Sequence, residues 1–224
     1  MKKPFNLKKF SKYLLSLVGY VLLVAADEFF APFAIPLLIA NVYIGLSPLL
    51  SCALFVAAYL LSLSISVTAV AAMSGAVAAI FFLITNKIGK KPNFSLALIT
   101  AVALVPYVLV RDCHNLTVRL ILAGVCVPLV FVFVSAAKVF LVKGLKYRLS
   151  TDEIVSAAAL FSVASYGAIN LFSAPVYECF AVTAILVSGM IMRRSCCSVT
   201  AIISALPLFF NTENPAFFAP LALY

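Results

Sequence analysis

The sequence predicts an all-α protein, a polytopic transmembrane bundle of about eight to ten helices. Of its 224 residues, 65% are hydrophobic and only 10% are charged, and the mean hydropathy is +1.19. A soluble domain averages about 45–50% apolar and about 25% charged residues. Charge-poor runs close to the length of a bilayer crossing, about 20 residues, recur along the whole chain. These runs are apolar on every side rather than alternating, which favours membrane helices over membrane strands.

Nine apolar runs are candidate crossings, and one further run is too short to cross. The nine runs are 13–26, 30–46, two within 49–85 that separate near 62–68, 94–110, 120–142, 154–172, 176–192 and 196–210. The last run, 216–224, leads us to expect an incomplete final span. We therefore divide the chain into a basic cytoplasmic N-terminus, 1–12, and one multispanning membrane domain, 13–224, with no soluble domain.

The basic residues predict the orientation of the bundle. Lysine and arginine cluster in four places between the apolar runs: residues 2–12, 87–91, 138–148 and 193–194. With a cytoplasmic N-terminus, 14 of the 16 basic residues fall on the cytoplasmic side, and only Arg111 and Arg119 fall outside. Cytoplasmic loops of membrane proteins carry such an excess of basic residues. We therefore expect a multi-pass protein of the plasma membrane with its N-terminus in the cytoplasm.

The net charge of +9 does not indicate nucleic-acid binding. Its basic residues form short clusters between apolar runs, where they face lipid headgroups, and there is no basic face with interleaved aromatic residues on a soluble element. The expected partner is the lipid bilayer. The six cysteines form no CxxC pair, and most lie in apolar runs, where a thiol behaves as a small hydrophobic group.

The first apolar run has two interpretations. A basic start, an apolar core and the sequence VAADE, with small residues Val24 and Ala26, resemble a signal peptide cleaved between Ala26 and Asp27. In a multispanning protein the first helix is instead kept as a signal anchor. The sequence leaves cleavage open.

The stretch KYRLSTDEIVSAAAL, residues 146–160, predicts the start of a membrane helix. Ser150 and Glu153 have the spacing of a capping box, and acidic residues are stabilised near a helix N-terminus by the helix dipole. The apolar run 154–172 that follows would be about 28 Å long at 1.5 Å per residue, close to the hydrocarbon thickness.

Two segments resemble the membrane region of stage II sporulation protein E, the sporulation serine phosphatase of Firmicutes. The first is LSTDEIVSAAALFSVASYGA, which follows a basic run. The second is FFAPFAIPLLIANVYIGLSPLLSCALFVAAYLL, which carries Pro32, Phe33 and Pro36. Their order and spacing agree with the family, and the similarity covers about residues 13–210. Two departures are an absent arginine in the first span and few glycines in the later spans.

The resemblance implies an anchor rather than an enzyme. In the family, the membrane region places a metal-dependent serine phosphatase at the asymmetric division septum, supports self-association and engages cell-division proteins. The phosphatase acts on a phosphorylated anti-anti-sigma factor and so activates a forespore sigma factor. The phosphatase domain has no counterpart in these 224 residues, so only anchoring, septal localisation and self-association carry over. The sequence leaves open whether the chain is a fragment or stands alone.

No motif predicts catalysis, a cofactor or a metal site. The only compact polar cluster is 111–115, which contains Arg111, Asp112, Cys113, His114 and Asn115. A metal site needs three or four converging ligands, and the remaining acidic residues lie far along the chain, so we interpret the cluster as a solvated outer loop. There is no GxSxG elbow, phosphate-binding loop or GxGxxG.

A small-solute transporter, or the membrane subunit of an importer, is the alternative function. Asp27 and Glu28 would be candidates for a proton or cation relay if they were buried in the membrane, although they lie at the end of a run, near the interface. Glu178 lies in a similar position. Proline-containing spans such as residues 31–38 also occur at transporter binding sites.

A face of small residues, Ala71, Gly75 and Ala79, predicts close helix packing in the run that follows residue 68. Such a face serves either packing within the bundle or a homo-oligomer. Cys196 and Cys197, beside Arg193 and Arg194, are interpreted as thiols that line apolar surface.

Overall fold

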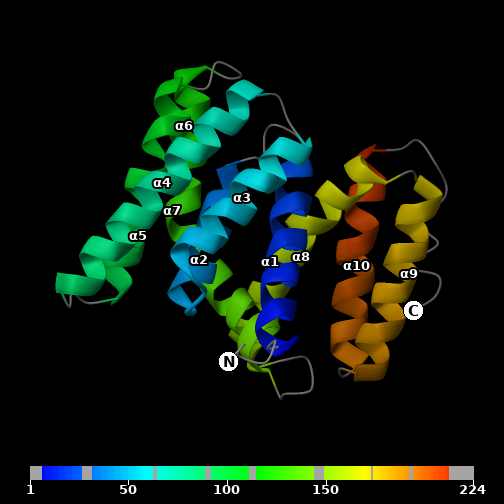
Figure 1. Ribbon diagram of the computed structural model, residues 1–224. Helices are drawn as coiled ribbons and strands as arrows, with labels where there is room; N and C mark the ends of the chain where they lie inside the picture. Colours follow the sequence, from blue (N-terminus) through cyan, green and yellow to red (C-terminus); the bar gives the residue numbers. More distant parts are fainter. Residues whose placement is uncertain are drawn as a thin grey trace.

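The computed structural model consists of packed helices (Figure 1). It describes residues 7–26, 32–62, 65–88, 92–110, 115–143, 149–172, 174–191 and 194–211. Within these ranges there is no strand. The predicted all-α class is confirmed.

The helices follow the predicted apolar runs in order. They are α1 (Leu7–Ala25), α2 (Ala34–Tyr43), α3 (Pro48–Ser62), α4 (Ile65–Ile88), α5 (Pro92–Ala103), α6 (Val105–Val110), α7 (Leu116–Lys138), the π-helical segment η2 (Val139–Lys143), α8 (Thr151–Leu171), α9 (Ala174–Ile191) and α10 (Arg194–Asn211). The predicted break near residues 62–68 is confirmed, because α3 ends at Ser62 and α4 begins at Ile65. The run 94–110 is divided at Leu104 between α5 and α6.

The short helix α2 lies at the centre of the larger part of the bundle. Every residue from Ala34 to Val42 is buried, and the helix contacts α1, α3, α5 and, most extensively, α7. A helix that is apolar on all sides either lies in a protein core or faces lipid, and here protein covers it. The neighbouring helices therefore form a shell around α2.

Helix α2 ends in a Schellman motif. The Gly45 N–H donates to the Val42 carbonyl at 3.0 Å, and the Leu46 N–H donates to the Asn41 carbonyl at 3.2 Å. Gly45 has a φ of 104°, a left-handed conformation that glycine adopts without steric cost. These bonds satisfy the last carbonyls of a buried helix and turn the chain towards α3.

Three aromatic side chains pack beside α2 in the interface between α1 and α3. Tyr20 and Phe55 meet edge to face with ring centroids 5.7 Å apart, and Phe55 meets Tyr59 at 5.0 Å. All three rings are buried. Edge-to-face pairs align the positive ring edge with the negative ring face, so this cluster fixes how α1 lies against α3.

Helices α8, α9 and α10 form the other side of the bundle (Figure 1). A small core of Ala168, Ile169, Tyr177 and Ala181 lies between α8 and α9. The Tyr177 hydroxyl donates to the Ser204 carbonyl of α10 at 2.8 Å. Helix α8 also packs along α1 and α7, and it therefore joins the two sides.

Three of the described helices are long and apolar enough to cross a membrane. They are Val67–Ile84 in α4, Leu116–Lys143 in α7 and η2, and Thr151–Leu171 in α8. The sequence led us to expect nine such crossings. The other described apolar helices are shorter; α2, with 10 residues, is only about 15 Å long at 1.5 Å per residue.

Proline and glycine account for two of the shortened runs. In the run 30–46, Pro32 and Phe33 form a 3₁₀ turn before α2. At the C-terminal end of α2, Gly45 terminates the helix. In the run 94–110, Pro106 has no N–H to continue the ladder of α5. Proline is tolerated in the first turn of a helix, and Pro106 lies there in α6.

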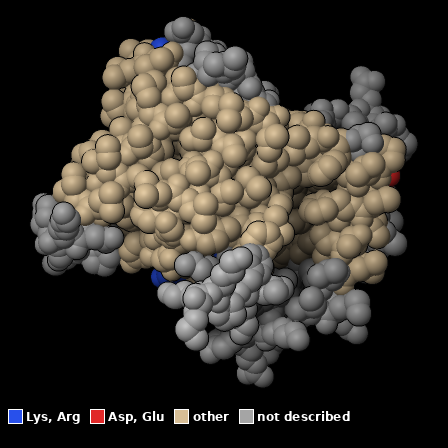
Figure 2. Space-filling model, viewed as in Figure 1, with Lys and Arg blue, Asp and Glu red and all other residues tan. Residues whose placement is uncertain are grey.

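The exterior of the bundle is apolar. Leu49, Leu61 and Leu109 are each more than 70% exposed, and many other large hydrophobic side chains are at least half exposed. On the face shown in Figure 2, the charged side chains of described residues lie only at the margins. Soluble monomers rarely expose large apolar patches, so this surface suits contact with lipid.

Candidate functional site

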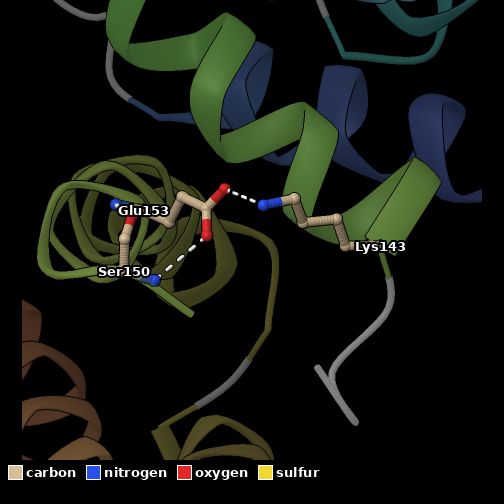
Figure 3. Close-up of polar contacts among 3 residues, drawn as sticks. All are labelled: Lys143, Ser150 and Glu153. Carbon is tan, nitrogen blue, oxygen red and sulfur yellow. Dashed lines mark hydrogen bonds and ion pairs between the residues drawn. The ribbon is translucent and has the colours of Figure 1, made fainter. Parts of the chain in front are cut away.

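The junction between η2 and α8 contains the capping-box residues and part of one basic cluster that the sequence singled out. The predicted capping box is confirmed: the Ser150 N–H donates to Glu153 Oε2 at 3.1 Å, and the Glu153 N–H donates to Ser150 Oγ at 3.3 Å. Figure 3 shows both residues at the first turn of α8. The reciprocal bonds satisfy backbone donors that have no partner within the helix.

Lys143 completes this junction from the preceding element. Its Nζ donates to Glu153 Oε1 and forms an ion pair with it (Figure 3). Lys143 is the last residue of η2, so the pair fastens the end of the α7–η2 unit to the start of α8. An exposed ion pair contributes little to stability; here it brings the end of η2 and the first turn of α8 side by side.

The π-helical segment η2 buries two apolar side chains in the bundle. Val139 and Leu141 are buried, while Val142 and Lys143 are exposed. Short π-helical turns occur mostly within or at the end of α helices, and often at functional sites. In this protein the π turn places Lys143 within reach of Glu153.

A buried polar pair, which the sequence did not single out, links α1 to α2. The Asn41 Nδ2 donates to the Tyr20 hydroxyl at 2.9 Å. Asn41 is 1% exposed and Tyr20 is fully buried. The sequence signal was weak: Asn41 is one polar residue in the apolar stretch LLIANVYIG.

Arg119 connects α7 to the end of α6. Its Nη1 donates to the Val108 carbonyl at 2.7 Å, and cations are favoured near the C-terminal end of a helix. Asn115 is exposed at the start of α7 and makes no side-chain capping bond. The rest of the predicted polar cluster, Arg111 to His114, lies outside the described residues.

The other ionisable residues that the sequence singled out are not brought together. Asp27 and Glu28 lie outside the described residues, as do the side chains of Arg193, Arg194, Cys196 and Cys197. Glu178 is half-buried on α9. Within the described part of the chain, no group of three or more His, Cys, Asp or Glu side chains could hold a metal ion.

The small-residue face of α4 packs within the bundle. Ala71 and Ala79 are buried, and α4 lies along α3. The Cys52 Sγ donates to the Gly75 carbonyl at 3.2 Å, so a side chain of α3 reaches the α4 backbone. This face therefore serves packing between helices of one chain, the first of the two uses considered above.

Comparison with known proteins gives no relative. No protein-family model, curated protein or solved structure matches the chain.

Proposed function

We propose that this protein is a membrane anchor that acts as the multispanning region of a factor like stage II sporulation protein E. The observation that carries anchoring is the apolar exterior, with Leu49, Leu61 and Leu109 among its most exposed residues. A bundle with such a surface is solvated by lipid, and close packing and hydrogen bonds between its helices hold the spans together.

The capped, ion-paired junction supports the same proposal. Glu153 binds Ser150 on its own helix and Lys143 on the preceding element. This arrangement holds Lys143 and Ser150, which flank the basic segment in the sequence, at one end of two helices that are long and apolar enough to span a membrane, where we place the cytoplasm. The junction lies in the segment that resembles the sporulation family, and that resemblance is the argument for a septal location.

A fluorescent fusion tests the anchoring role directly. Residues 1–224 fused to a fluorescent protein are expressed in an endospore-forming host that is followed through asymmetric division. The proposal expects fluorescence in the plasma membrane that concentrates at the asymmetric septum. Uniform membrane fluorescence throughout sporulation would contradict septal targeting, and soluble fluorescence would contradict anchoring itself.

The size and timing of the native protein test the family assignment. An antibody against residues 1–12 is used on membranes from growing and sporulating cells. A product much larger than 24.0 kDa, present only during sporulation, is expected if the anchor carries a phosphatase. A product near 24 kDa in growing cells would contradict the assignment.

Transport is the second candidate, and the short buried helix α2 favours it. Discontinuous helices near the bilayer midplane form the solute sites of many transporters, and α2 has only 10 residues and starts after a 3₁₀ turn. Reaction of Asp27 and Glu28 with an aqueous carboxyl reagent separates the two candidates. Shielded carboxylates favour transport, and full reactivity from outside favours an interface loop of an anchor.

A further inference from the structure

A cavity opens between α1, α2, η2 and α8. Its volume is about 130 Å³, and its wall includes Leu15 and Val18 of α1, Leu37 of α2, Phe140 of η2, and Leu160 and Phe161 of α8. Leu15 and Val18 are nearly half exposed, so the cavity reaches the outer surface of the bundle. At the membrane location proposed above, the medium at that surface is lipid.

One polar side chain in the wall has an unused hydrogen-bond acceptor. Asn41 is 1% exposed and lines the cavity. Its Nδ2 is bonded to Tyr20, but its Oδ1 is buried and has no partner. The nearby Ser16 hydroxyl does not serve it, because that hydroxyl donates to the Lys12 carbonyl at 2.9 Å.

These features define the chemistry of an occupant. A buried polar atom without a partner is costly, so the occupant must bring a hydrogen-bond donor to Asn41 Oδ1. Apart from Ser16, whose hydroxyl is bonded to Lys12, the rest of the wall is apolar, and it includes no charged side chain. The occupant is therefore uncharged there, because burying an unpaired charge is far more costly. An apolar cavity of about 150 Å³ binds benzene, so the part inside is of that size.

We propose that this cavity binds the hydroxyl end of an uncharged, single-chain lipid alcohol, with the hydroxyl donating to Asn41 Oδ1. The first carbons of the chain fill the space against Leu37 and Phe161, and the remainder leaves past Leu15 into the bilayer. The proposal rests on the membrane location of the bundle proposed above, but not on septal targeting or on the family resemblance.

Photolabelling of the purified full chain in phosphatidylcholine liposomes tests the proposal. The probe is a long-chain alcohol with a diazirine next to its hydroxyl end, and labelled peptides are mapped by mass spectrometry. Labelling is expected on α1 and α8 around the cavity and is expected to saturate. Unlabelled alcohol should compete about five-fold better than the hydrocarbon of equal length at equal membrane mole fraction, as expected for one hydrogen bond.

Two variants and a control locate the site. Ala164→Phe places a ring in the cavity, because Ala164 lines it, and it should abolish saturable labelling. Val155, on the same helix, is 62% exposed and does not line the cavity, so Val155→Phe should leave labelling unchanged. Asn41→Leu should keep labelling but remove the preference for the alcohol over the hydrocarbon.

Three outcomes would overturn the proposal. They are labelling that does not saturate, equal competition by alcohol and hydrocarbon in the unaltered protein, and saturable labelling that persists in folded Ala164→Phe. If Ala164→Phe does not fold, the competition in the unaltered protein decides. If the cavity holds only water and no lipid alcohol, labelling would not saturate, which is the first of these outcomes. Loss of septal fluorescence in the fusion experiment would leave these results unaffected.

Discussion

Gly167 of α8 lies so close to Leu22 of α1 that a β carbon on residue 167 would be 1.7 Å from the Leu22 carbonyl oxygen. The same β carbon would be 2.9 Å from the Ala26 backbone nitrogen. One turn along α8, the Asn170 Nδ2 donates to the Ala25 carbonyl at 3.1 Å. The backbones of these two helices are in contact, as small residues allow in membrane bundles.

Replacing Gly167 by alanine should separate α1 from α8. The clash is with backbone atoms, which cannot move aside as a flexible side chain can, so we expect a loss at the upper end of overpacking costs, about 3 kcal/mol. The measurement is thermal unfolding of the purified protein in detergent. The control is Gly124→Ala in α7, where an added β carbon meets no atom within 4 Å and should stabilise the helix by about 0.5–1 kcal/mol. Equal stabilities of the two variants would contradict the close approach.

Tyr20 and Asn41 should be energetically coupled. Tyr20→Phe leaves the Asn41 amide without its partner, and Asn41→Leu leaves the Tyr20 hydroxyl without one, so each single variant carries the cost of an unpaired buried group. The double variant should be less destabilised than the sum, by about 0.6 kcal/mol, the average for hydrogen bonds between membrane helices. A double-mutant cycle measures this difference in detergent unfolding. Strict additivity would show that the 2.9 Å bond contributes nothing.

The sequence predicted the helices well, because the signals involved are local. The capping box depends on residues three positions apart, Ser150 and Glu153, and the structure has both of its bonds. The break between α3 and α4 was expected near residues 62–68 and lies there. Apolar runs and capping residues act within one or two helical turns, so one sequence is enough to read them.

The sequence could not predict features that depend on packing between distant segments. Helix α2 was expected as a full crossing, since its run is apolar from residue 30 to 46, but it occupies only Ala34–Tyr43. The bond from Asn41 to Tyr20 spans 21 residues, and the contact of Gly167 with Leu22 joins two helices, α1 and α8, that are far apart in the sequence. The cavity beside Asn41 depends on such contacts between distant segments, so hydrophobic periodicity and residue spacing could not predict it either.

Ser150 should stabilise the start of α8 through its side chain. Ser150→Ala removes the acceptor of the Glu153 N–H and should cost about 1 kcal/mol, the usual value for an N-cap. Ser150→Thr keeps a hydroxyl at the same place and should retain most of the stability. Hydrogen exchange at the first turn of α8 gives a local measurement: it should quicken in the alanine variant only. Similar exchange in both variants would show that the capping box is not formed in the membrane.

The two ends of the α7–η2 unit should lie on opposite sides of the membrane, because Leu116–Lys143 is one of the helices long and apolar enough to span it. Asn115, before it, and Thr151, after η2, are exposed and suit single-cysteine variants in a background without the six native cysteines. With the basic segment in the cytoplasm, an impermeant maleimide should label Asn115→Cys in intact cells. Thr151→Cys should be labelled only after lysis. Labelling of both in intact cells would show that this unit does not cross, and the reverse pattern would invert the orientation drawn from the basic clusters.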